Sequence, residues 1–191
     1  MRSPMTRTPA RLPRRALLAS GPAAAAFAPE ARAASAAELT RDSEQAIEQL
    51  KRQRPYAREL LSRAHAVLAF PSIVKAGLLI GGSFGDGVLR VGAEVRGYYR
   101  LAAGSYGLQA GAQSFSMVMA FMNPGALRYL DRSDGWQVGV GPSFVIADES
   151  FARSYTSTTV TQDVVVFIFG QHGAMAGLGV EGSKITRFNP G

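Results

Sequence analysis

The distribution of glycine divides this chain into two parts that are expected to fold differently. Of its 21 glycines, 20 lie at or after Gly77, and none lies between Ala34 and Ala76. Glycine costs stability inside a helix, and inside a strand it marks a bend, a bulge or the close approach of another element. We therefore expect helices before Gly77 and strands with turns after it.

The first 33 residues have the composition of an export signal. Arg11, Arg14 and Arg15 form a basic region, residues 16–28 are short and alanine-rich, and Ala31-Arg32-Ala33 has the small-x-small pattern of a signal-peptidase site. The paired arginines resemble a twin-arginine signal, and an ordinary export signal is the alternative. Either route predicts an exported protein of the periplasm or envelope.

Charge and cysteine content argue against several classes of protein. Outside the first 33 residues the chain carries 15 basic and 13 acidic residues, so its net charge there is +2 rather than +7. The high isoelectric point therefore gives no reason to expect nucleic-acid binding. No cysteine occurs, which excludes disulfides and a lipoprotein anchor, and no apolar run approaches the ~18 residues of a membrane-spanning helix.

The first expected helix has a clear start and a narrow apolar face. Ser35 and Glu38 form a capping box, which predicts a helix beginning near Ala36. The residues expected to be buried along one face of this helix are Leu39, Ser43, Ala46 and Leu50.

A second helix is expected from Tyr56 to about Ala69, with a wide apolar stripe. We predict that it ends before Pro71, because proline lacks a backbone N–H and disfavours the helical conformation at Phe70. The stretch from His65 to Gly87 would then join this helix to the glycine-rich part of the chain.

Short apolar runs separated by turn signals predict strands in the rest of the chain. These strands are expected at about 76–83, 87–94, 95–101, 105–113, 115–122, 136–146, 161–169 and 173–181. Residues 126–130 are expected to form a helical turn, and residues 164–169 (VVVFIF) a strand covered on both faces.

A Gly-x-x-x-Gly spacing recurs through these strands, starting at Gly77, Gly107, Gly135 and Gly173. Residues i and i+4 of a strand share a face, so each pair leaves bare backbone on one side of the sheet. The fold class expected is α+β, with N-terminal amphipathic helices on a strongly curved, partly closed antiparallel sheet. We expect a single domain over residues 34–191, helical over 34–70 and mostly β over 71–191.

Motifs for catalysis, metals or nucleotides do not stand out. His65 and His172 are the only histidines, no Gly-x-Ser-x-Gly motif occurs, and the glycine-rich loops lack the Gly-Lys-Ser/Thr of a phosphate site. We predict no catalytic residue, metal or cofactor. An enzyme acting on envelope lipids, with one of the two histidines as its base, is kept as an alternative.

Basic residues near the end of the helical part are the candidate binding residues. Lys75 lies alone in an apolar run, so its ammonium group must either reach solvent or meet an anion. Arg52, Arg54 and Arg58 follow as candidates, because a basic helical face beside an apolar stripe attracts anionic head groups. A solvated helix face is the alternative for these arginines.

From Ala64 to Ile185 the chain resembles the SYLF domain, a lipid-binding family of eukaryotic actin and endocytosis adaptors and of bacterial exported proteins. Three segments carry the resemblance, and they read AVLAFPSIVKAG with the glycines after it, YGLQAGAQ from Tyr106, and GAMAGLGVEGSKI from Gly173. The resemblance implies a non-enzymatic domain that binds lipid, with phosphoinositides as the ligands of eukaryotic members, and it implies actin binding.

The sequence and the resemblance together predict an envelope domain that binds an anionic phospholipid or another amphiphile, or a membrane surface. The alternative is a structural or protein-interaction module of the envelope without a lipid ligand. Neither the sequence nor the resemblance predicts the oligomeric state.

Overall fold

The computed structural model describes residues 34–132, 136–137, 142–147 and 162–191, and it is α+β as expected. The expected export signal lies outside these residues. The elements are α1 (Ala36–Gln53), α2 (Pro55–Arg63), β1 (Ala66–Val91), β2 (Glu94–Phe121), α3 (Pro124–Leu130), β3 (Trp136–Gln137), β4 (Phe144–Ile146) and β5 (Val164–Phe188).

Three very long strands make up most of the sheet. β2 lies in the centre and pairs antiparallel with β1 along one edge and with β5 along the other. The short β3 pairs antiparallel with one end of β5, and β4 pairs parallel with the other end. The antiparallel sheet expected from the sequence is confirmed for the long strands, and β4 makes it a mixed sheet.

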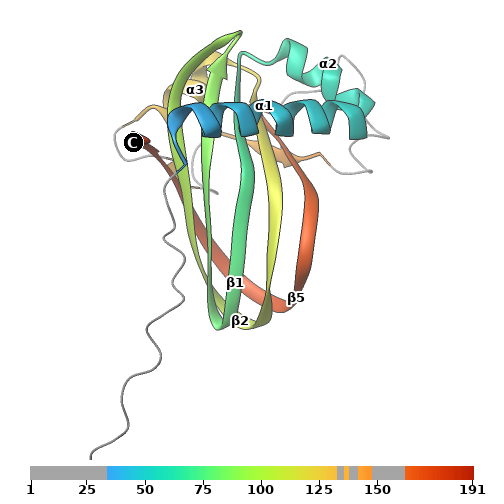
Figure 1. Ribbon diagram of the computed structural model, residues 1–191, viewed down its shortest axis with the longest axis vertical. Helices are drawn as coiled ribbons and strands as arrows, with labels where there is room; N and C mark the ends of the chain where they lie inside the picture. The colour runs from blue at the N-terminus through green and yellow to red at the C-terminus, as the bar shows by residue number, and fades with distance from the viewer. Residues whose placement is uncertain (1–33, 133–135, 138–141, 148–161) are drawn as a thin grey trace, which may run out of the picture. The chain divides into compact units, whose positions relative to one another are not determined.

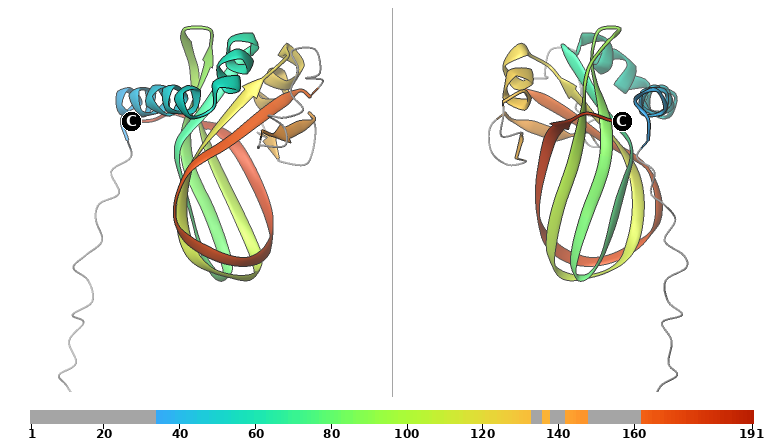
Figure 2. Two further views of the ribbon diagram at one scale, coloured as in Figure 1. Left: turned by 90° about the vertical axis from the view of Figure 1, so that its right-hand side faces the viewer. Right: turned by 60° about the vertical axis from the view of Figure 1, so that its left-hand side comes forward.

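Each long strand bends in the middle and returns, so the sheet folds over on itself (Figures 1 and 2). The expectation of separate strands at 76–83 and 87–94, and likewise within β2 and β5, is therefore wrong: β1, β2 and β5 are 26, 28 and 25 residues long. Most of the turns expected between these strands are bends within one continuous strand. The strongly curved sheet itself is confirmed.

The Gly-x-x-x-Gly pairs of the long strands lie at these bends. Gly111 has a φ of +133° and Gly173 a φ of +90°, values that L side chains rarely adopt. A Cβ on Gly111 would lie 2.3 Å from the carbonyl oxygen of Ala174, and one on Gly173 would lie 2.5 Å from that of Ala112. Glycine is therefore required here by both backbone conformation and space. The fourth expected pair, from Gly135, lies outside the described residues.

Further glycines let the two halves of β1 touch each other. A Cβ on Gly85 would lie 2.7 Å from the side chain of Ile73, and one on Gly87 would lie 2.7 Å from the carbonyl oxygen of Ala69. The phenyl ring of Phe70 is equally close to Gly87. These contacts bring both arms of the bent strand together and form a seam, which we call the β1 seam.

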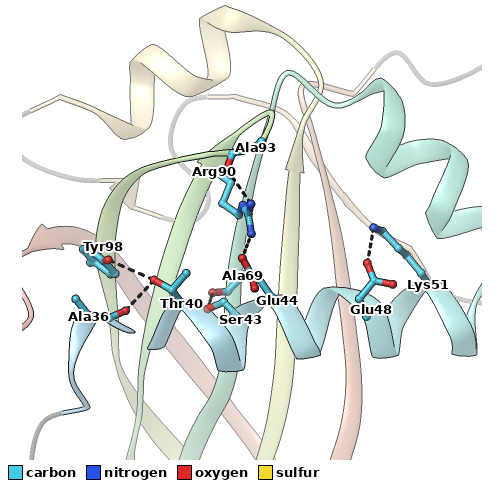
Figure 3. Close-up of polar contacts among 10 residues, drawn as sticks. All are labelled: Ala36, Thr40, Ser43, Glu44, Glu48, Lys51, Ala69, Arg90, Ala93 and Tyr98. Atoms are coloured by element: carbon cyan, nitrogen blue, oxygen red, sulfur yellow. Dashed lines mark hydrogen bonds and ion pairs between the residues drawn. The ribbon is translucent and has the colours of Figure 1, made fainter. Parts of the chain in front are cut away.

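The helix α1 begins and packs as the sequence predicts. The capping box of Ser35 and Glu38 is present, and the buried residues are the four that were expected. Figure 3 shows the polar contacts that hold this helix against the sheet. Ser43 donates a hydrogen bond of 3.2 Å to a carbonyl of β1, Glu44 forms an ion pair with Arg90, and the Thr40 and Tyr98 hydroxyls lie 3.3 Å apart.

The second helix is shorter than predicted, and the prediction that Pro71 ends it is wrong. α2 ends at Arg63, and β1 begins at Ala66, so the stretch expected to be helical up to residue 70 already contains strand. Alternate residues of this stretch face opposite sides of the sheet, a period of two that a short apolar run does not reveal. Pro71 lies in an edge strand where the register shifts, between Phe70 and Ile73, a position that tolerates proline.

Two apolar cores lie on the two faces of the sheet. α1 and α2 pack on the outer face, against Ala69, Val118, Val165 and Phe167 among others. The concave face forms the second core, and the buried residues of α3 pack against it. The strand that reads VVVFIF contributes to both cores, so the prediction that it is covered on both faces is confirmed, as is a short helix over residues 126–130.

The β1 seam predicts a strong difference between two glycines of the same sheet. We expect Gly87→Ala to lower the free energy of unfolding by roughly 1–3 kcal/mol, because a methyl group must displace backbone or the Phe70 ring. Gly104→Ala, at a position where an added Cβ meets nothing within 4 Å, should change it by less than about 0.5 kcal/mol. Urea unfolding of both variants measures this difference, and equal stabilities would refute the close packing of the seam.

Candidate functional site

The folded sheet forms a cavity of about 430 Å³ that is open to solvent on one side, and its walls come from all three long strands and from Ile146 of β4. This volume falls within the roughly 300–1,000 Å³ typical of small-molecule sites. Most of the lining is apolar, and these side chains are Ile73, Leu101, Phe115, Met117, Met119, Ile146, Val166, Ile168 and Ile185. Two of them are methionines, whose flexible thioethers adapt to ligands of irregular shape. Such a lining suits hydrocarbon.

A small set of polar side chains lines the same cavity. They are Lys75, Ser83, Gln113, Gln171 and Ser183. Lys75 and Gln113 are register partners on β1 and β2, and the two serines come from the returning halves of β1 and β5. Lys75 is half-buried and supplies the positive charge among the lining residues. The cavity therefore combines an apolar interior with one ammonium group and several hydrogen-bonding groups.

One end of the concave face is covered by α3. Asn123 caps this helix by accepting a hydrogen bond of 2.9 Å from the N–H of Ala126. At the other end of the helix, Tyr99 of β2 donates a hydrogen bond of 2.5 Å to Asp131. Burial and this hydrogen bond raise the pKa of Tyr99 above its usual range, so the phenol stays protonated and keeps donating. The apolar core under α3 is thus closed by a fixed helix.

Of the four predicted binding residues, only Lys75 lines this cavity. Arg54 instead connects the helices to the sheet: one guanidinium nitrogen donates to the carbonyl of Ala147 at 2.7 Å and another to that of Ile168 at 2.8 Å. These bonds explain its position between α1 and α2 without any ligand. The prediction that Arg54 binds lipid remains untested, and the structure gives it a different role.

Arg52 and Arg58 lie on the helical side of the sheet. Arg52 is exposed near the end of α1. Arg58 lines a groove of about 550 Å³ between the helices and β1, which also contains Lys51, Glu48 and the Glu44–Arg90 ion pair. The Lys51 ammonium lies 2.8 Å from Glu48. Two carboxylates therefore pair with two of the three cations of this groove, Lys51 and Arg90, and leave a formal charge of +1 there.

Sequence reasoning missed the polar partners of Lys75. The position of Gln113 could have been predicted, because residues 113, 115 and 117 alternate along a strand and so face the same side of the sheet. Two of these three residues, Phe115 and Met117, are apolar. The two serines and Gln171 carried no such signal, since they reach the cavity only through the folding of the sheet. Neither histidine lines the cavity or the groove, and the described residues contain no cluster suited to a metal ion.

Comparison with known families gives a match over the second half of the chain. Residues 102–189 match the model of the family described as "Ysc84: Las17-binding protein actin regulator", which is the SYLF family that the sequence motifs resemble. Residues 102–189 of the chain are therefore similar to the SYLF family. The match includes the second and third motifs, from Tyr106 and Gly173, and runs from the middle of β2 to the end of β5. The family is one of binding and adaptor domains. No curated protein matches the chain significantly.

None of the helices in the described part of the chain combines the length and apolar character needed to span a membrane.

The position of Arg54 predicts a structural effect that its neighbour Arg52 lacks. We expect Arg54→Ala to lower the free energy of unfolding by roughly 1.5–3 kcal/mol, because two carbonyls lose a charged donor. Arg52→Ala should change it by less than about 0.5 kcal/mol. Chemical denaturation of the two variants gives these values. If Arg54→Ala is as stable as the parent protein, the guanidinium does not hold the helices to the sheet.

Proposed function

We propose that this chain is an exported, non-enzymatic protein of the bacterial envelope, and that its folded sheet holds the hydrocarbon chain of an anionic phospholipid or related amphiphile. The observation that carries the proposal is the cavity itself, which is apolar over most of its wall and contains the half-buried Lys75. The composition of the first 33 residues supports export, and the likeness of residues 102–189 to a binding family supports a function without catalysis.

The energetics of such a ligand follow from the lining. Each methylene group that leaves water for the apolar wall contributes about 0.8 kcal/mol. A chain of several methylenes therefore binds with useful affinity even after the entropic costs of association. The methionines Met117 and Met119 permit chains of different length and unsaturation.

The head group is selected by the polar part of the lining. A carboxylate or phosphate near Lys75 gains an interaction on the order of 1 kcal/mol. Gln113, Gln171 and the two serines offer amide and hydroxyl groups that bond to either an anionic or a neutral head group. The charge preference of the site therefore depends on Lys75, while the affinity depends mainly on the apolar wall.

Lys75 can be tested against a lysine of the same sheet that faces the other way. Lys184 follows Ser183 on β5, and because successive strand residues face opposite sides, it lies on the outer surface, where it is exposed. Titration with cis-parinaric acid, a fluorescent fatty acid, should give saturable binding to the purified protein. Lys75→Met should raise its Kd about three- to tenfold, which corresponds to roughly 0.7–1.4 kcal/mol. Lys184→Met should leave the Kd unchanged.

Three results would count against the proposal. A folded protein that fails to bind the fatty acid would exclude a hydrocarbon site in the cavity. If Lys75→Met and Lys184→Met raise the Kd equally, the preference for an anionic ligand comes from the overall charge of the protein and not from the cavity. A partner protein captured together with an empty cavity would favour the interaction module that the sequence left as an alternative.

A further inference from the structure

The bends of the three long strands lie at the end of the sheet opposite to the helices (Figures 1 and 2). Three large side chains there are mostly in solvent: Leu78 is 75% exposed, Ile80 71% and Tyr106 73%. Leu79 beside them is 54% exposed. Ile80 and Tyr106 are register partners on β1 and β2, so these side chains form one patch. We call this patch the apolar tip.

Ionisable residues are absent from the sequence around the apolar tip. Residues 76–85, 101–112 and 173–180, which form the bends of the three strands and their flanks, include no Asp, Glu, Lys, Arg or His. Exposed protein surface normally mixes apolar side chains with charged ones, and large uncharged apolar patches mark interaction sites. The charged or titratable residues directly next to these stretches are Lys75, Asp86, Arg100, His172 and Glu181, and Asp86 and Arg100 form a salt bridge of 2.7 Å.

The backbone at the tip takes a conformation that keeps these side chains outward. Leu79 has a φ of +66° and lies where the register between β1 and β2 shifts, between Leu78 and Ile80. A leucine in this region is strained, and the surrounding structure must hold it there. The strained residue therefore presents three consecutive aliphatic side chains at the most bent part of an edge strand.

We propose that the apolar tip inserts into the outer part of a lipid bilayer and docks the domain on the membrane. The patch is convex, so a rigid protein surface would contact only part of it, whereas fluid lipid can surround every side chain. Tyr106 adds an aromatic ring with a polar hydroxyl, the type of side chain enriched at membrane interfaces. The inference rests on the proposed function only in that the membrane would supply the ligand of the cavity.

Docking through this surface depends on apolar contact rather than on charge. The domain should therefore bind vesicles of neutral phosphatidylcholine nearly as well as vesicles that contain phosphatidylglycerol. It should also stay bound at high salt, where a basic surface would release. This distinguishes the apolar tip from the arginines of α1 and α2.

A single fluorescent label tests the insertion, because the chain contains no native cysteine. An NBD group on Ile80→Cys should brighten and shift to shorter wavelength when phosphatidylcholine vesicles are added, at both 0.1 M and 1 M salt, as expected for an apolar environment. The matched control is Val95→Cys, at a partly exposed residue close to the turn between β1 and β2, at the other end of these strands. Its label should not respond to vesicles.

Substitution of the tip gives a second readout. The double variant Leu78→Gln, Ile80→Gln should weaken vesicle binding at least tenfold in a flotation assay. Its affinity for cis-parinaric acid in vesicle-free solution should be unchanged, which also reports that it is folded. Retained vesicle binding by this variant, or an NBD signal that rises equally at both labelled positions, would overturn the proposed docking.

Other outcomes separate this inference from the proposed function. A label at residue 80 that responds to protein concentration without vesicles would assign the tip to contact with a second copy and overturn the membrane role. Vesicle docking by a protein that binds no fatty acid would support the tip and refute the cavity as a lipid site. Fatty-acid binding by a protein that does not bind vesicles would support the cavity as a lipid site and refute docking through the apolar tip.

Discussion

The structure depends on one constraint, which is that the three long strands must fold back on themselves without breaking their ladders. Glycine makes this possible at two places. At the bends it permits positive φ values and backbone packing so close that an added Cβ would lie only 2.3–2.5 Å from a carbonyl oxygen. At the β1 seam, Gly85 and Gly87 let the two arms of one strand touch. The cavity exists because the sheet folds there, and the exposed tip is the outer side of the same fold.

The helices have a supporting role in this arrangement. α1 and α2 cover the outer face of the sheet and supply its second core, and Arg54 connects them to the carbonyls of Ala147 and Ile168. α3 covers the concave face near one end, beside the hydrogen bond between Tyr99 and Asp131. The apolar space between these supports and the bends is the space that the proposed ligand occupies.

The sequence predicted the features that depend on local chemistry. The capping box of Ser35 defined the start of α1, and the glycine spacing defined a curved sheet. The start of β1 was missed, because the apolar run before Pro71 fits both helical and strand periods until its pairing with β2 is known. Bends within strands were mistaken for turns between them, since both require glycine.

The site could be predicted only in part for the same reason. Lys75 was found because a lysine between apolar neighbours is conspicuous in a sequence. Its partners depend on registers between residues far apart in the chain, such as Lys75 with Gln113. The role of Arg54 could not be predicted either, since its acceptors are backbone carbonyls that carry no sequence signal.

The central claim is that the cavity holds lipid. Native mass spectrometry of the protein purified from a bacterial envelope tests it most directly: we predict one bound amphiphile per chain, released by organic solvent, and a spectrum of the bare protein alone would contradict the claim.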